Sequence, residues 1–134
     1  MISTAAYTPR ALSVLRIVTA FLFIQHGTAK FFGAPHVGMF DGFQAMSLMG
    51  VAGALELVGG ALLMIGLFTR PVAFLLAGFM AAAYFMGHAS QGHVLTPILN
   101  QGELAIMFSF VFLFLSAAGG GAWSADAARG KASA

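Results

Sequence analysis

Four long apolar stretches, separated by short polar segments, dominate the chain. They cover approximately residues 10–32, 46–68, 71–88 and 101–118, and each is close to the ~17–25 residues that a helix needs to cross a bilayer. The last has the shortest uninterrupted apolar run, residues 104–118, and reaches a full span only if the helix extends through Asn100 and Gly119. This pattern predicts an all-α integral membrane protein, a four-helix bundle with antiparallel neighbours and short loops.

The composition agrees with a membrane protein. Of the 134 residues, 60% are hydrophobic and 7% are charged, whereas soluble domains carry roughly 25% charged residues. The loops leave no room for a soluble domain, so we expect a single transmembrane domain over residues 1–134 with a small, polar, frayed tail at residues 119–134. The first stretch contains Arg16, His26 and Lys30, and we therefore do not expect it to be a cleaved signal peptide.

Positive charge is distributed unevenly over the two ends of the predicted bundle. Five of the six Lys and Arg residues lie at the end that holds both termini, and Lys30 lies near the opposite face. The five are Arg10, Arg16, Arg70, Arg129 and Lys131. Because cytoplasmic loops carry an excess of Lys and Arg, we expect both termini in the cytoplasm. The pI of about 9.5 follows from this topology; it is compatible with contact to anionic lipids and does not indicate nucleic-acid binding.

The chain contains no cysteine. It therefore cannot itself perform thiol–disulfide exchange, hold an iron–sulfur cluster on thiolates or attach c-type haem. The four histidines, His26, His36, His88 and His93, all map to the outer half of the bundle. They lack the spacing of a ligand set, so neither a metal nor b-type haem is predicted.

Glu56 lies at the centre of the second apolar stretch. A carboxylate at that depth is costly unless it is paired, protonated or hydrated, so it marks a candidate site. On the first helix, Arg16, His26 and Lys30 share one face, which we expect to point into the bundle or a water-filled cavity, and Arg16 and His26 are the candidate partners of Glu56. Two interpretations stay open. Either these groups take part in chemistry or transport, or they form a polar clasp between helices, with Arg16 and Lys30 reaching toward the two interfaces.

The start of the fourth stretch carries Asn100 and Glu103. Asn followed three residues later by Glu is a capping-box arrangement, which gives Glu103 a structural role. Alternation of the four spans also brings Glu103 to the same depth as Lys30. We therefore expect an ion pair between Lys30 and Glu103 near the outer surface.

The second stretch is rich in glycine. Gly53, Gly59, Gly60 and Gly66 leave small surfaces against which another helix can pack closely. They lack the spacing and the preceding strand of a phosphate-binding loop, so nucleotide binding is not predicted.

Five segments, in matching order and spacing, resemble the DoxX family of small four-span bacterial membrane proteins. They are Arg16 in the first helix; residues 26–30, HGTAK; residues 56–63, ELVGGALL, followed by residues 66–70, GLFTR; residues 100–103, NQGE; and residues 123–126, WSAD. The characteristic positions of the family map onto Arg16, His26, Lys30, Glu56, Asn100 and Glu103. The resemblance thus identifies these six residues as candidates for a buried polar or ligand site.

The resemblance also implies a location and a kind of function. The family belongs to the bacterial inner (cytoplasmic) membrane. Some relatives are membrane subunits of quinone-reducing thiosulfate oxidoreductases, and others assemble with thiol-related enzymes and superoxide dismutase in oxidative-stress complexes. Because this chain lacks cysteine, any thiol chemistry would have to reside in a partner.

Three functions compete on this basis. The leading interpretation is a membrane subunit of a redox complex, quinone-linked or related to oxidative stress, in which Glu56, His26 and Lys30, beside Phe23 and Phe31, supply a proton to a quinone. The second is a non-enzymatic membrane anchor or scaffold for a soluble partner enzyme. The third is a pathway for a small solute or protons, with Glu56 as a relay. The sequence does not choose among them, and it names no substrate, partner or oligomeric state.

Overall fold

The structure, a computed structural model, describes residues 4–130, and its only regular secondary structure in that range is helical. Its main helices are α1 (Thr8–Phe32), α2 (Leu48–Ile65), α3 (Thr69–Ala83), α4 (Glu103–Ala118) and the short α5 (Ala125–Ala128). Single helical turns are η1 (Thr4–Ala6), η2 (Gly38–Phe40), the π-helical η3 (Tyr84–His88) and η4 (Ala89–Gln91). No strand occurs between residues 4 and 130, so the predicted all-α class is confirmed.

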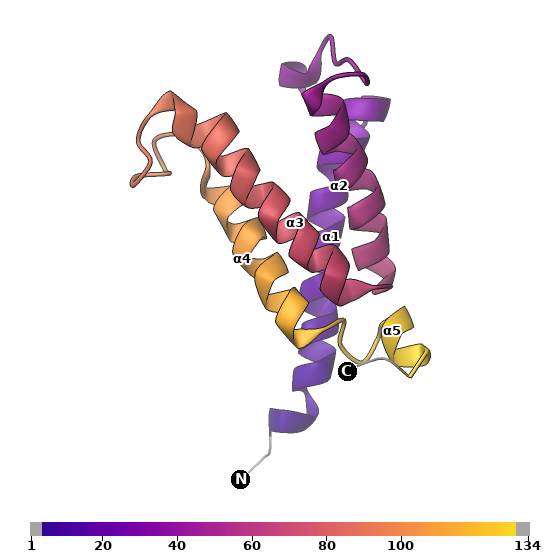
Figure 1. Cartoon of the computed structure of the whole chain (residues 1–134). Helices are drawn as coiled ribbons and strands as arrows, with labels where there is room; N and C mark the ends of the chain where they lie inside the picture. The colour runs from indigo at the N-terminus through magenta and orange to yellow at the C-terminus, as the bar shows by residue number, and fades with distance from the viewer. Residues whose placement is uncertain (1–3, 131–134) are drawn as a thin grey trace.

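The bundle consists of two helical hairpins. α1 packs most extensively against α2, and α3 packs most extensively against α4, while the two hairpins share a smaller contact. Figure 1 shows that the hairpins converge at the end that carries α5 and separate toward the opposite end. The core therefore lies in the lower and central part of the view, where all four helices meet.

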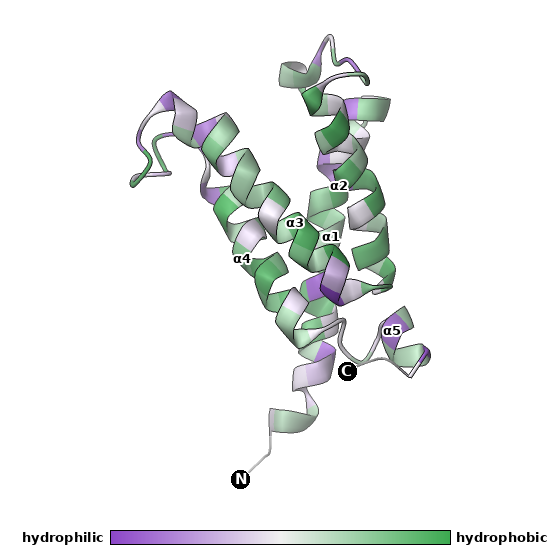
Figure 2. Ribbon diagram, viewed as in Figure 1, coloured by the Kyte–Doolittle hydropathy of each residue, from purple (hydrophilic) through white to green (hydrophobic). Residues whose placement is uncertain are grey.

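Within residues 4–130, three helical stretches are long and apolar enough to cross a membrane: Thr8–Phe32, Leu48–Ile65 and Thr69–Gln91. The fourth, α4, is apolar but only 16 residues long. Hydrophobic residues predominate along the helices (Figure 2). Many of their large side chains are exposed, for example Phe74 and Phe110, which are 64% and 65% exposed. A surface of this kind is stable in lipid and not in water, which agrees with an integral membrane bundle.

The ends of α2 and α3 depart by a few residues from the predicted boundaries. α2 begins at Leu48, because the Ser47 Oγ accepts a hydrogen bond from the Gly50 N–H at 3.2 Å and caps the first turn. It ends at Ile65 instead of residue 68, because Gly66 adopts a left-handed conformation with φ 70°. α3 then begins at Thr69 and passes into the π-helical turn η3 at Tyr84.

Phe23 is the centre of the contact between the two hairpins. It is 1% exposed, and its ring centroid lies 4.9–6.4 Å from those of Phe79, Phe108 and Phe112, all edge-on. Such edge-to-face pairs are favourable beyond the apolar area they bury. One aromatic side chain of α1 thereby joins the first hairpin to α3 and α4.

The glycines of α2 permit close packing, as the sequence predicted. A Cβ added at Gly59 would lie 2.9 Å from the side chain of Leu76 on α3, and one added at Gly60 would lie 3.0 Å from Ile24 on α1. Both distances are shorter than carbon atoms tolerate. The small residues therefore set how closely α2 approaches its neighbours on two sides.

Candidate functional site

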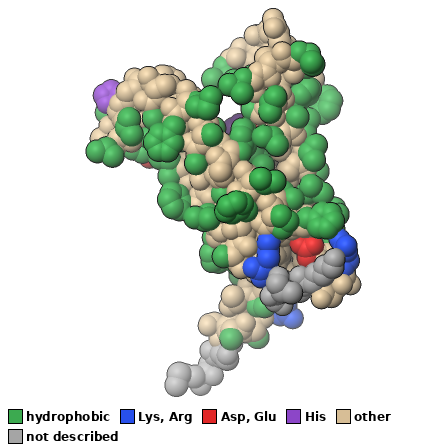
Figure 3. Space-filling model, in the orientation of Figure 1, with side chains coloured by type: hydrophobic (Ala, Val, Ile, Leu, Met, Phe, Trp, Pro, Cys, Tyr) green, Lys and Arg blue, Asp and Glu red, His purple; other side chains and the backbone are tan. Residues whose placement is uncertain are grey.

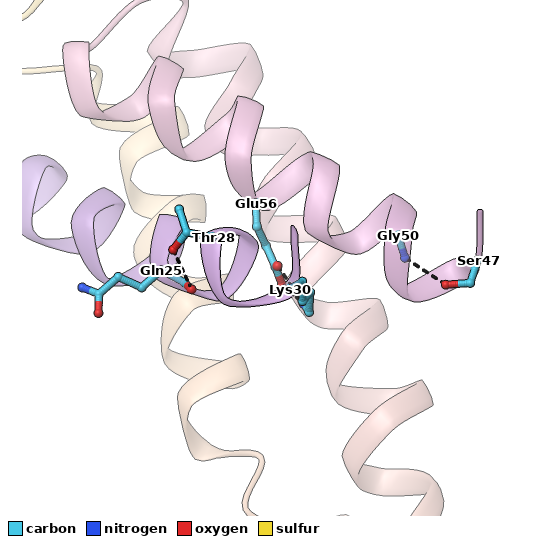
Figure 4. A network of polar contacts seen from close by, with 6 residues as sticks. All are labelled: Gln25, Thr28, Lys30, Ser47, Gly50 and Glu56. Carbon is cyan, nitrogen blue, oxygen red and sulfur yellow. Dashed lines mark hydrogen bonds and ion pairs between the residues drawn. The ribbon is translucent and has the colours of Figure 1, made fainter. Parts of the chain in front are cut away.

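Lys30 and Glu56 form a buried ion pair. The Lys30 Nζ lies 2.6 Å from Oε1 and 2.7 Å from Oε2 of Glu56, and the two residues are 8% and 6% exposed. Figure 4 shows the Glu56 side chain of α2 pointing to Lys30 on the last turn of α1. The expected pair between Lys30 and Glu103 is therefore wrong, and so is the expectation that Arg16 or His26 is the partner of Glu56.

Two glycines explain why this pair forms. A Cβ at Gly27 would lie 2.9 Å from the carbonyl oxygen of Gly53, so α1 and α2 touch backbone to backbone at this point. A Cβ at Gly53 would in turn lie 3.3 Å from Cδ of Lys30. The absence of side chains at both positions lets the Lys30 chain run along α2 to reach Glu56 one turn further on.

The loop between α1 and α2 (residues 33–47), named the outer loop after its predicted orientation, covers the ion pair with aromatic side chains. The ring centre of Phe40, in η2, lies 5.1 Å from the Lys30 Nζ, within the range of a cation–π contact. Phe43 packs edge-on against Phe31 at 5.0 Å. The ammonium group thus faces two carboxylate oxygens on one side and an aromatic ring on another. A buried pair of this kind requires such additional contacts, because removing both charges from water costs several kcal/mol per ion.

Glu103 and Asn100 do not form the predicted capping box. Glu103 is exposed and is the first residue of α4, whose N-cap is Gly102. Asn100 is 6% exposed; its Oδ1 accepts from the Gly102 N–H at 2.9 Å, and its Nδ2 donates to the carbonyl oxygens of Gly92 and His93 and to the Tyr84 hydroxyl. Asn100 therefore fastens the loop between α3 and α4, and Glu103 lies outside this network.

Arg16 is fully buried and binds only backbone carbonyls in the described part of the chain. Its Nη1 donates to Leu63 and Met64 at 2.5 and 2.6 Å, at the C-terminal end of α2. Its Nε and Nη2 donate to Gly120 and Trp123 at 2.8 and 2.5 Å. The guanidinium group thus joins α1, α2 and the C-terminal segment, and its charge offsets the negative end of the α2 dipole.

The C-terminal segment to residue 130 is docked on the bundle, so the expectation of a frayed tail is wrong for residues 119–130. The Asp126 carboxylate accepts from the backbone N–H of Phe68 at 2.9 Å and of Thr69 at 2.8 Å. It thereby caps the N-terminus of α3 from a position 57 residues away. The Asp126 N–H donates to the carbonyl oxygen of Gly66 at 3.0 Å. Lys131 and the rest of the predicted tail lie outside the described residues.

The pKa of Asp126 reflects this capping role. Burial by itself raises the pKa, but the hydrogen bonds from Thr69 and Phe68 and the positive charge of Arg129 outweigh burial, so the pKa lies below the usual value of an aspartate. The sequence contained one signal that this segment is ordered. Ser124 is a good N-cap residue, and its Oγ accepts a hydrogen bond from the Ala127 N–H at the start of α5. The signal was overlooked because the segment has no apolar periodicity.

The histidines occupy separate environments. His26 is half-buried and its ring centroid lies 6.1 Å from that of Phe108 on α4, so it lies between the two hairpins. His36 is exposed and pairs with Asp41 at 2.9 Å, whereas the His88 Nδ1 lies 3.0 Å from the carbonyl oxygen of Asn100. Within residues 4–130 no group of three His, Cys, Asp or Glu side chains is arranged to hold a metal ion.

Two surface cavities are lined by residues other than the six candidates. One, of about 270 Å³, lies within the outer loop and is lined by residues that include Phe40, Asp41 and Met49. The other, of about 360 Å³, lies between α3 and α4 and is lined by Gly78, Ser109 and neighbouring apolar side chains. The structure thus brings Lys30 and Glu56 together, and leaves Arg16, His26, Asn100 and Glu103 in four other places.

Comparison with known proteins places the chain in a family. A family model described as DoxX matches residues 11–89. An uncharacterized protein of Haemophilus influenzae is 47% identical to the chain over 123 residues, which make up 90% of this chain and 91% of that protein. No solved structure matches the chain. Since the family model covers more than half of the chain and the resemblance of its motifs points the same way, the protein belongs to the DoxX family.

Proposed function

We propose that this DoxX-family protein is the membrane subunit of a redox complex, quinone-linked or related to oxidative stress, and that it serves there as an anchor for a soluble redox partner. It lies in the bacterial inner membrane as a single domain with both termini cytoplasmic. The observation that supports an anchor is that the buried charged side chains of Lys30, Glu56 and Arg16 bind groups within the chain itself. Lys30 and Glu56 bind each other, and Arg16 binds four backbone carbonyls.

The geometry of the ion pair explains why we favour an anchor over a proton relay at Glu56. A relay must exchange its proton with a donor and an acceptor within hydrogen-bond reach. Both carboxylate oxygens of Glu56 face the same ammonium group, and the Phe40 ring covers that group from the outer side. Such an arrangement holds two helices together in lipid, where an unpaired charge is costly.

Purification in mild detergent tests this proposal. We expect soluble redox enzymes to co-purify with the full chain, and a Lys30→Met, Glu56→Leu double variant that still accumulates in the membrane to retain the same partners. Loss of the partners from a double variant that folds would contradict a purely structural pair. Solute or proton flux through liposomes that contain the purified protein alone would instead favour the third function, a transport pathway.

A second candidate, direct contact with a quinone, rests on His26. Its imidazole is half-buried between the hairpins and lies next to the Phe108 ring, which in turn packs against Phe23. A quinone site combines an apolar slot with a nearby hydrogen-bonding group. Organic extraction of the purified protein identifies a bound quinone. Under this candidate His26→Leu loses the quinone, whereas the Lys30→Met, Glu56→Leu variant keeps it.

A further inference from the structure

The end of the molecule that carries α5 exposes cations and aromatic side chains. Arg129 is exposed directly after α5, and its guanidinium carbon lies 5.2 Å from the centre of the Phe68 ring. Phe68 is 50% exposed and Trp123 is 56% exposed. Arg10 is exposed in the first turn of α1. Figure 3 shows Lys and Arg side chains on both sides of an acidic side chain at this end.

Backbone contacts bring these side chains to the same end of the molecule. The Ala122 N–H donates to the carbonyl oxygen of Pro9 at 3.0 Å, so residues 122 and 123 run beside the turn that carries Arg10. The Phe68 N–H donates to the Asp126 carboxylate, so Phe68 lies beside α5. Arg10, Phe68, Trp123 and Arg129 are therefore all neighbours of the docked C-terminal segment.

The acidic group at this end is engaged internally. Both Asp126 oxygens accept hydrogen bonds from the start of α3, and the residue is only 9% exposed. The outward surface therefore presents the positive charges of Arg10 and Arg129. Trp and Tyr collect at the headgroup level of membranes, and Arg binds phosphate through its planar fork of donors.

We propose that Arg10, Arg129 and Trp123 form a binding surface for the headgroup of an anionic phospholipid. Each guanidinium group binds a lipid phosphate, the Phe68 ring holds the guanidinium of Arg129 in place, and the Trp123 indole lies at the level of the glycerol backbone. A zwitterionic lipid carries the same phosphate, but its own cation offsets the charge that the arginines recognise. The surface therefore prefers phosphatidylglycerol to phosphatidylcholine.

The fluorescence of Trp123 tests this surface directly, because Trp123 is the chain's single tryptophan. The full chain is reconstituted into phosphatidylcholine vesicles that contain either brominated phosphatidylglycerol or, as the matched control, phosphatidylcholine brominated at the same acyl positions. Bromine quenches the indole on contact. Each cation near an anionic membrane surface contributes about 1 kcal/mol, which is about five-fold, so we expect the two arginines together to give phosphatidylglycerol a preference of about thirty-fold.

Exposed Arg129 can be changed without disturbing the core. We expect Arg129→Gln to lower the preference about five-fold, Arg129→Lys to retain most of it, and high salt to weaken it in the wild type. Equal quenching by the two lipids in the wild type would overturn the proposal. An unchanged preference in an Arg10→Gln, Arg129→Gln double variant would also overturn it, as would displacement of phosphatidylglycerol by millimolar inorganic phosphate.

Discussion

Removal of one member of the Lys30–Glu56 pair should be more damaging than removal of both. Lys30→Met or Glu56→Leu leaves an uncompensated charge among apolar side chains, and for buried pairs this costs about 3–5 kcal/mol of unfolding free energy. The double variant removes both charges, so we expect it to lose clearly less than the sum of the two single variants. Denaturation in mixed detergent micelles measures each free energy, and strict additivity of the two losses would contradict the pairing.

The partner of Lys30 could not be identified from depth in the bilayer. The alternation of the spans brings Glu103 to the depth of Lys30, and depth alone therefore predicted Glu103 as the partner of Lys30 and left Arg16 or His26 for Glu56. The rotation of α1 about its own axis decides the pairing, because Gly27 and Gly53 place the two backbones in contact and direct Lys30 along α2. Such a rotation follows from side-chain shapes on both helices and is not contained in a hydropathy pattern.

Arg16 should tolerate no substitution that removes its guanidinium group, because that group donates all of its hydrogen bonds. In Arg16→Met the carbonyl oxygens of Leu63, Gly120 and Trp123 lose their donors in a buried site, and we expect a loss of at least about 3 kcal/mol, since hydrogen bonds to charged groups contribute about 1.5–3 kcal/mol each. Arg16→Lys keeps the charge but not the planar geometry, and should be intermediate. The same micelle denaturation checks both, and a Lys variant as stable as the wild type would show that charge alone is sufficient.

Among the helices, side chains from distant segments cap three helix ends near α5. In each case the charge of the side chain is opposite in sign to that end of the helix dipole. Arg16 binds carbonyls at the C-terminal end of α2, Asp126 binds N–H groups at the start of α3, and Arg70 binds the carbonyls of Ser116 and Ala117 at the end of α4. Cations stabilise the negative C-terminus of a helix and anions the positive N-terminus. The order of the C-terminal segment follows from these contacts.

Asp126 should make stability depend on pH in the acid range. The pKa of Asp126 is lowered in the folded protein, so in acid the unfolded chain binds more protons than the folded protein. The contribution of Asp126 to the free energy of unfolding is therefore fully present above its unfolded pKa of about 3.9. That contribution is lost as the pH falls from about 4 through the lower, folded pKa. We expect Asp126→Asn to weaken the capping of α3 at neutral pH and to flatten the acid part of the stability profile, as measured by micelle denaturation between about pH 6 and 3.

Asp41→Asn is the matched control for this pH dependence. Asp41 is exposed in the outer loop and pairs with the equally exposed His36, so its removal should change stability by less than about 1 kcal/mol. If the Asp126→Asn and wild-type profiles run parallel between about pH 6 and 3, the capping carboxylate is not the source of the acid sensitivity.

Over the whole molecule, the physics of the bilayer made the architecture predictable. Lipid requires long apolar helices and tolerates few charges, so the order and approximate bounds of the four long helices α1–α4 could be read from the pattern of apolar positions. The motifs indicated the DoxX family. The C-terminal segment was misread because hydrogen bonds to Ser13 and Arg16 order it. Composition does not reveal hydrogen bonds of this kind.

The separation of the hairpins was also not predictable. It depends on how the Phe23 cluster and the glycines of α2 set the angles between helices, whereas the sequence pattern specifies only which residues face inward. The six candidate residues were predicted to form one buried polar site. In the structure only Lys30 and Glu56 are in contact, and the other four lie apart from them and from one another. Of these residues, Arg16 and Asn100 are held by backbone atoms of other segments, which a pattern of side chains along the chain does not show.

The orientation of the bundle in the membrane gives the last prediction. Arg10, Arg70 and Arg129 lie at the end that carries α5, and the positive-inside rule places this end in the cytoplasm. Because the chain has no cysteine, single cysteines can be introduced at the exposed positions Met46, in the outer loop, and Ala128, in α5. In intact cells we expect a membrane-impermeant maleimide to label Met46→Cys and to spare Ala128→Cys until the cells are permeabilised. A permeant maleimide, which should label both, is the control, and the reverse pattern with the impermeant reagent would show the opposite orientation.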